Sequence, residues 1–121
     1  MPPSEAEHIV AAIEDVIQAG WRAVDALTSA IARSSYAQDR IAENVPVAEA
    51  LSGVLARGPR QQVALSMERY ESALRKLRER SALLLIEREG LTFTEVGRRM
   101  GVSRHMVARL YNSARTADDE D

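Results

Sequence analysis

Cysteine is absent from this sequence of 121 residues, which excludes disulfide bonds, thiolate metal sites and cysteine nucleophiles. Aromatic residues are scarce, with one Trp, one Phe and three Tyr, so aliphatic side chains must supply most of the core. No apolar run exceeds the five residues of Ala82 to Ile86, whereas a membrane-spanning helix needs about 20. Residues 1–7 lack the basic start and apolar stretch of a signal peptide. We therefore expect a cytoplasmic protein with no membrane partner.

Groups that carry catalysis are also few. The two histidines, His8 and His105, lie in different parts of the chain, and no histidine–carboxylate spacing suggests metal ligation. No Gly-rich phosphate loop or nucleophile elbow is present. We therefore predict that the protein is not an enzyme and has no catalytic residue, no cofactor and no metal site.

The apolar residues that are present recur at helical spacing, and no segment alternates as a strand does. Ser4 and Glu7 form a capping box that predicts a helix start, with a helical pattern to about Ser34. The segment 36–44 is either a continuation of this helix or a loop. We predict an all-α fold in which a long N-terminal helix and a helical bundle precede a C-terminal helix-turn-helix region of three or four helices.

Two further helices are expected before residue 90. One starts near Pro46 and ends at Gly58-Pro59, because proline favours a first helical position and Gly-Pro interrupts a helix. The next starts at Arg60 and either runs unbroken to Glu89 or bends near Arg80. Gly90 is the expected stop, since glycine commonly follows the last helical residue.

A heptad pattern runs along the first predicted helix for more than three repeats. Two alternatives follow: the helix pairs with a second copy, or it folds back over the later helices of its own chain. We predict a homodimer, because a chain this small cannot easily cover so long a stripe. The predicted dimer interface, called the apolar stripe below, consists of Val10, Ile13, Ile17, Val24, Leu27 and Ile31.

The most informative segment is residues 91–115, LTFTEVGRRMGVSRHMVARLYNSAR. Thr92 and Glu95 form a second capping box, and Gly101 stands where a helix end favours a left-handed residue. Ser103 is an N-cap candidate for the helix that follows. Gly97 suggests that the second helix passes close to the backbone of the first. Two short helices joined by a glycine turn are typical of proteins that lay the second helix in the DNA major groove.

Residues 74–115, LRKLRERSALLLIEREGLTFTEVGRRMGVSRHMVARLYNSAR, resemble region four of bacterial sigma factors, most of all the extracytoplasmic-function type. The resemblance covers the last third of the chain and implies that the helix after Ser103 reads promoter DNA. It also implies RNA polymerase as a possible partner. Two positions depart from the family pattern: Arg78 stands where a proline is usual, and Gly97 where alanine is usual. Without that proline, one long helix can replace the break expected near Leu77.

Charge divides the chain into three parts. Residues 1–59 contain four Arg and eight Asp or Glu, residues 60–117 contain twelve Lys or Arg and six Glu, and residues 118–121 are all acidic. The net charges are therefore −4, +6 and −4. We expect an N-terminal interaction and dimerisation region at 1–59, the helix-turn-helix DNA-binding domain at 60–117, and an acidic tail at 118–121.

The second helix of the motif has a predicted inner face of Val107, Leu110 and Tyr111, which places other residue types outside. Arg, Asn and Ala are side chains that read base edges in the major groove. The predicted base contacts are Arg104, His105, Ala108, Arg109 and Asn112. The predicted phosphate contacts are Thr92, Arg98, Arg99, Ser103 and Arg115, although Arg115 equally suits a helix end.

These observations predict a transcriptional regulator at the nucleoid that binds double-stranded DNA as a dimer reading paired half-sites through helix 104–115. A complete sigma factor is excluded, because residues 1–59 lack the aromatic-rich helix that melts promoter DNA and contain only Trp21 and Tyr36 as aromatics. Two alternatives stay open. One is a sigma-like adaptor or decoy that binds RNA polymerase or another regulator without specific DNA binding, and the other is a nucleoid-associated protein.

Overall fold

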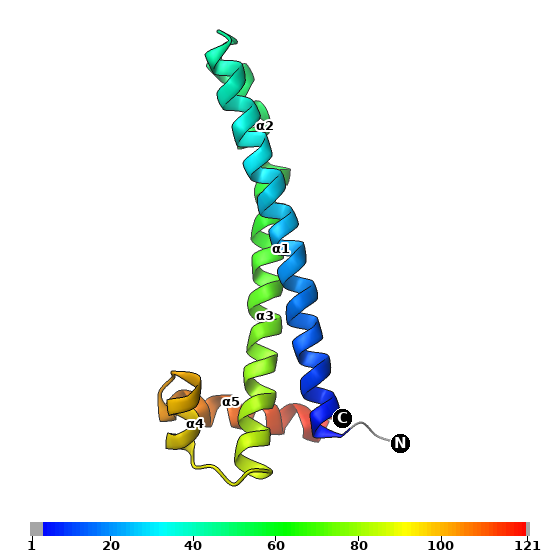
Figure 1. The fold of residues 1–121 in the computed structure, drawn as a ribbon, viewed down its shortest axis with the longest axis vertical. Helices are drawn as coiled ribbons and strands as arrows, with labels where there is room; N and C mark the ends of the chain where they lie inside the picture. The colour runs from blue at the N-terminus through cyan, green and yellow to red at the C-terminus, as the bar shows by residue number, and fades with distance from the viewer. Residues whose placement is uncertain (1–3, 121) are drawn as a thin grey trace. The chain divides into compact units, whose positions relative to one another are not determined.

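The computed structural model describes residues 4–120 and the side chains of residues 4–118. Within this range the chain forms five α-helices and no strand, which confirms the predicted all-α class. No described helix is both long enough and apolar enough to cross a membrane. The helices are α1 (Glu5–Ala42), α2 (Val47–Leu55), α3 (Arg57–Glu87), α4 (Phe93–Met100) and α5 (Arg104–Glu120), as labelled in Figure 1.

These helices form two compact units. The first is Ile17–Glu71, which holds most of α1, all of α2 and the first part of α3. The second comprises the described parts of Met1–Val16 and Ser72–Asp121, and so contains α4 and α5. The region boundary predicted at residue 59 falls in the first turn of α3. Pro59 lies in the first turn of α3, where the missing N–H of proline costs no helical hydrogen bond.

The ends of α1 are set by local hydrogen bonds. The predicted capping box is present: Ser4 Oγ accepts from the Glu7 N–H, and Glu7 Oε2 accepts from the Ser4 N–H, both at 3.2 Å. The helix continues to Ala42, so the segment after Ser34 is helical and not a loop. It ends before Asn44, whose φ of +67° is a left-handed conformation that asparagine tolerates.

Within Ile17–Glu71, α1 lies beside α3 (Figure 1), and the most buried residues of α1 are small. Ala23 and Ala37 are buried, with exposed fractions of 7% and 2%. A Cβ added to Gly20 would lie 3.8 Å from the Tyr70 ring of α3. Small residues allow two helices to approach closely, because the interaxial distance depends on the side chains at the contact.

The apolar stripe lies on a different face of α1 and stays about half exposed within the chain. Ala23 directly precedes Val24 of the stripe, and Ala37 directly precedes Gln38, which lies two heptads after Val24. The buried face is therefore rotated by one residue from the stripe. Folding back on α3 and an exposed apolar stripe are therefore compatible within one chain. Exposed fractions along the stripe are 65% for Val10, 42% for Ile13, 44% for Ile17, 48% for Val24, 42% for Leu27 and 66% for Ile31.

The third helix is unbroken from Arg57 to Glu87, with no interruption near Leu77. The resemblance to sigma region four implied a break there, and the arginine at position 78 in place of proline allows the helix to continue. Gly90, with a φ of +69°, turns the chain after the helix end, and the Leu91 N–H donates to the Leu85 carbonyl at 3.0 Å. The predicted stop at Gly90 is therefore confirmed.

Candidate nucleic-acid interface

The end of α3, α4 and α5 pack around a small aliphatic core. Ala82, Val96 and Val107 have no exposed surface, and Leu110 is 7% exposed. The predicted inward face of α5 is therefore correct for Val107 and Leu110. Ala114, also buried, extends this face by one turn and was not anticipated. Partly buried side chains complete the core: Leu85, Ile86, Leu91, Phe93, Met100 and Val102.

Side-chain and backbone caps define both helices of the motif. Thr92 Oγ1 accepts from the Glu95 N–H at 3.1 Å, and Ser103 Oγ accepts from the Met106 N–H at 3.1 Å. Gly101, with a φ of +70°, ends α4 in the left-handed conformation. These three caps were predicted, and together they fix the three residues that connect α4 to α5.

Gly97 permits a close approach between α4 and the start of α5. A Cβ at this position would lie 2.7 Å from the carbonyl oxygen of Val102, which is shorter than a van der Waals contact. The Val102 N–H also donates to the Gly97 carbonyl at 2.9 Å. The prediction that glycine is required for close packing is therefore confirmed, and the turn has little freedom to rearrange.

The outer face of α5 carries the residues predicted to contact bases. Arg104, His105, Arg109 and Asn112 are exposed, and Ala108 between them is half-buried. Helical spacing places residues 104, 105, 108, 109 and 112 on one face. Because Val107 and Leu110 are buried, this face is turned away from the core. The structure thus brings the five predicted residues together.

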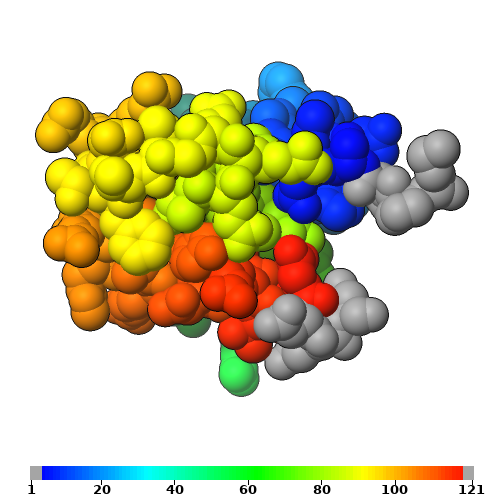
Figure 2. All heavy atoms as spheres, turned by 90° about the horizontal axis from the view of Figure 1, so that it is seen from below, coloured from blue at the N-terminus to red at the C-terminus, as the bar shows by residue number. Residues whose placement is uncertain are grey.

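Positive charge dominates this part of the chain. Residues 93–117 contain five arginines and one acidic residue, Glu95. Arg98, Arg99, Arg104 and Arg109 are exposed, and none forms an ion pair with a side chain that the structure describes. Figure 2 shows α4 and the preceding loop (yellow) beside α5 (orange to red) on one face of the molecule. Unpaired arginines on the surface attract phosphate groups.

Polar contacts hold the other side of α5 against α3. The Tyr111 hydroxyl donates to Glu87 Oε1 at 2.8 Å, and the Ser113 hydroxyl donates to Glu79 Oε1 at 3.1 Å. The hydrogen bond to Glu87, followed by desolvation, raises the pKa of Tyr111 above its ordinary value of 10.0. The Tyr111 ring also packs on Phe93, with ring centroids 5.6 Å apart. These contacts orient α5 and were not evident from the sequence.

The predicted acidic tail starts inside a helix. α5 continues to Glu120, and Asp118 forms an ion pair with Arg80 of α3, with an N–O distance of 2.8 Å. Asp121 lies outside the described residues, as do the side chains of residues 119 and 120. Residue 118 thus belongs to the packing of α5 on α3. The partner of Asp118 is 38 positions upstream, which no local pattern reveals.

The remaining predicted phosphate contacts have structural roles of their own. The hydroxyls of Thr92 and Ser103 are helix caps, and their backbone positions at the starts of α4 and α5 are where anions are favoured. The Arg115 guanidinium lies over the Tyr111 ring, 5.7 Å from its centroid. Whether these residues touch phosphate stays a prediction.

Comparisons of the chain with protein-family models, with curated proteins and with solved structures give no match. The fold and the site define an all-α chain with two short helices joined by a three-residue glycine turn. Function is therefore inferred from the residues of α4 and α5.

Proposed function

We propose that the protein is a DNA-binding transcriptional regulator whose helix α5 enters the major groove. The observation that carries this proposal is the outer face of α5, where exposed arginines without ion-pair partners project from a helix whose other side is fixed to the core. A rigid support matters because hydrogen bonds to base edges require accurate placement. In this proposal Arg104 and Arg109 recognise guanine, and Asn112 recognises adenine. His105 and Ala108 complete the base-reading surface.

Phosphate contacts would set the position of α5 on the duplex. In this proposal Arg98 and Arg99, which lie in the last turn of α4, and Ser103, at the start of α5, contact the DNA backbone beside the groove. Thr92 and Arg115 are assigned the same role. Such contacts make affinity fall steeply with salt, by about 10³-fold or more between 50 and 200 mM for six or more phosphates. The resemblance to sigma region four supports this arrangement and suggests a location at the nucleoid, with RNA polymerase as a possible further partner.

We further propose that the protein acts as a homodimer through the apolar stripe. Within Ile17–Glu71, the side chains of Ile17, Val24, Leu27 and Ile31 are 42–66% exposed, and neighbouring Trp21 is 64% exposed. Monomeric proteins rarely leave a contiguous apolar surface of this kind uncovered. The heptad spacing of the stripe suits pairing with an identical helix. A dimer would present two copies of α5 to paired half-sites.

The proposal is tested by selecting bound fragments from random DNA and measuring the affinity of the enriched sequence. Arg104→Ala and Arg109→Ala are each expected to weaken binding about 10- to 100-fold, because a bidentate arginine–guanine contact contributes about 1–3 kcal/mol. Arg22→Ala, an exposed arginine of α1, is the matched control and should bind as the unmodified protein does.

Three outcomes would redirect the proposal. Unchanged affinity in both α5 variants would remove α5 as the reading helix. Salt-sensitive binding without an enriched motif would indicate a nucleoid-associated protein. No DNA retention at low salt would favour the adaptor that binds RNA polymerase or another regulator.

A further inference from the structure

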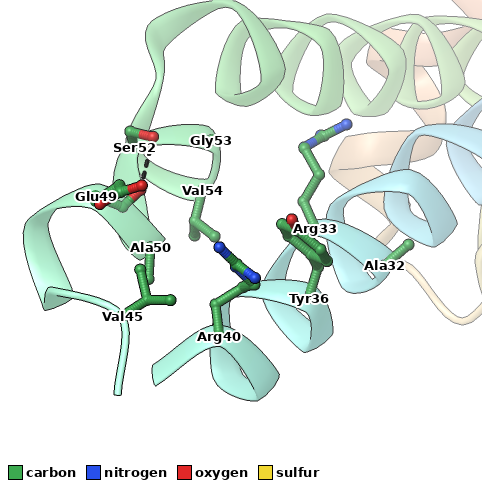
Figure 3. A pocket seen from close by; sticks show the side chains of 10 residues that line it. All are labelled: Ala32, Arg33, Tyr36, Arg40, Val45, Glu49, Ala50, Ser52, Gly53 and Val54. Atoms are coloured by element: carbon green, nitrogen blue, oxygen red, sulfur yellow. Dashed lines mark hydrogen bonds between the residues drawn. The ribbon is translucent and has the colours of Figure 1, made fainter. Parts of the chain in front are cut away.

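A groove with a volume of about 510 Å³ lies between the last turns of α1 and helix α2, entirely within Ile17–Glu71. Its size falls in the range of about 300–1,000 Å³ that is typical of sites for small organic molecules. Figure 3 shows the side chains that line it, which come from both helices and from the turn between them.

One wall of the groove is cationic and aromatic. Arg33, Tyr36 and Arg40 are three and four residues apart, which places them along one face of α1. The Arg40 guanidinium lies 5.8 Å from the centroid of the Tyr36 ring. In Figure 3 this guanidinium reaches toward Val54 of α2. Only four arginines occur in residues 1–59, and two of them line this groove, although this half of the chain is acidic overall.

The two arginines are only weakly neutralised. Arg40 pairs with Glu43 at 3.3 Å, and their side chains are 38% and 63% exposed. Such an exposed pair contributes about 0–1 kcal/mol, so a second anion can displace Glu43 readily. Arg33 forms no ion pair with any side chain in the described part of the chain. Among the described residues, Glu49 is the one acidic residue that lines the groove.

The opposite wall is apolar except for Glu49 and Ser52, and it follows the turn between α1 and α2. Val45, Ala50 and Val54 are partly buried and line the groove. The Val45 N–H donates to the Arg40 carbonyl at 3.0 Å, next to the left-handed residue Asn44. The apolar wall and the cationic wall are thus fixed relative to each other by backbone hydrogen bonding.

We propose that this groove binds a small organic anion that has a planar apolar body and a carboxylate. The carboxylate binds the Arg40 guanidinium in place of Glu43, with Arg33 at the other edge of the groove. The planar body lies against the apolar side chains of Val45, Ala50 and Val54. An inorganic anion would leave the apolar wall uncovered, and a neutral hydrocarbon would offer no anionic partner to Arg33. The site is separate from the DNA-reading face proposed for α5.

The test is a titration with 1-naphthoate, followed by NMR of the backbone amides on the full-length labelled protein. Binding in the groove is expected to shift the amides of residues 45–54 at millimolar probe. The neutral analogue 1-naphthalenemethanol should bind at least about tenfold more weakly, because it offers no charge-assisted hydrogen bond. Arg40→Gln is expected to weaken naphthoate binding about tenfold and to leave the neutral alcohol unaffected. Arg22→Gln is the matched control and should change neither.

Several results would overturn the proposal. One is equal affinity for naphthoate and the neutral alcohol. Another is unchanged naphthoate binding by Arg40→Gln. A third is the absence of shifts at residues 45–54. Shifts confined to residues 17–31 would also overturn the proposal, because that pattern would mean that the probe adsorbs to the apolar stripe. If circular dichroism shows that Arg40→Gln does not fold, Arg33→Gln replaces it, with an expected loss of about threefold.

Discussion

Gly97 is the position at which a single added carbon has the largest predicted effect. The Cβ of Gly97→Ala would lie 2.7 Å from the Val102 carbonyl oxygen, so α4 and the start of α5 would have to move apart. Overpacking of this kind typically costs about 1–3 kcal/mol. We expect the free energy of unfolding, measured with urea, to fall by that amount, even though alanine is the better helix former.

Gly53→Ala is the matched control for this substitution. Gly53 also lies inside a helix, but a Cβ there would meet no atom within 4 Å. We expect it to stabilise the protein by about 0.5–1 kcal/mol, because alanine loses less backbone entropy than glycine. If both variants gained stability, the claim that a Cβ at position 97 clashes with the Val102 carbonyl oxygen would be contradicted.

Tyr111 gives the structure a predictable response to alkaline pH. The hydrogen bond to Glu87 raises the pKa of Tyr111 above 10.0 in the folded protein. The folded state therefore binds the phenolic proton more tightly than the unfolded state does. The stabilisation is fully present below the unfolded pKa and is lost as pH rises through the higher folded pKa.

We expect Tyr111→Phe to be less stable than the unmodified protein at neutral pH and to approach it as the pH rises from 10.0 through the higher folded pKa of Tyr111, where the unmodified protein loses this contribution. The measurement is the difference in unfolding free energy between the two proteins across this range. Tyr36 and Tyr70 are common to both and cancel in the difference. A difference that did not change with pH would contradict the role given to the Glu87 hydrogen bond.

At the scale of the helix, the first turn of α5 combines a structural role and a proposed binding role in Ser103. Ser103→Ala removes the cap on the Met106 N–H and is expected to cost about 1 kcal/mol of stability. Ser103→Asp keeps a good N-cap, and its charge suits a helix N-terminus, so stability should be retained. The same charge would repel a phosphate, so DNA affinity should fall several-fold. Thermal unfolding and DNA titration of both variants separate the two roles.

If Ser103→Asp bound DNA as tightly as the unmodified protein, the start of α5 would not face the phosphate backbone. The prediction for Ser103→Ala would be unaffected, since it depends only on the hydrogen bond in the structure.

Helix ends were the part of the fold that the sequence predicted best. The capping box at Ser4, the caps at Thr92 and Ser103, and the turn glycines Gly90 and Gly101 all act over a few residues, so their signals are local. Contacts between distant positions were not predictable in this way. The Glu87–Tyr111 and Arg80–Asp118 contacts depend on how α5 crosses α3.

The face through which α1 packs was also predicted incompletely. The large aliphatic side chains identify the stripe in the sequence. The face of α1 that is buried within the chain contains Ala23, Ala37 and Gly20, small residues that do not mark it as a buried face in the sequence. For the candidate site, the burial of Val107 determines which face of α5 points to the core. The exposed residues of α5 can then be predicted from helical spacing alone. The α1–α2 groove was missed because it depends on the left-handed turn at Asn44.

At the scale of the whole molecule, the proposed dimer predicts which substitutions separate assembly from folding. Val24 is 48% exposed in the stripe, so Val24→Glu should leave helicity intact while placing a charge in an apolar interface. We expect the variant to be monomeric by light scattering at concentrations where the unmodified protein is dimeric. Trp21, the sole tryptophan, should show emission shifted to the blue only in the dimer.

Leu65→Glu is the control for this prediction. Leu65 is 46% exposed on α3, comparable with Val24, but it does not belong to the stripe. The Leu65→Glu variant should remain dimeric. A monomeric unmodified protein, or equal loss of assembly in both variants, would contradict pairing through the stripe.

The presence of a buried face and an exposed apolar face on α1 has a consequence for regulation. The most buried residues of α1 are small, and most of its large aliphatic side chains are exposed. If the stripe forms the proposed dimer, the fraction of the protein that can bind paired half-sites depends on protein concentration. The amount of protein in the cell would then act as an input signal, and modest changes in synthesis or turnover would translate into a steeper change in promoter occupancy.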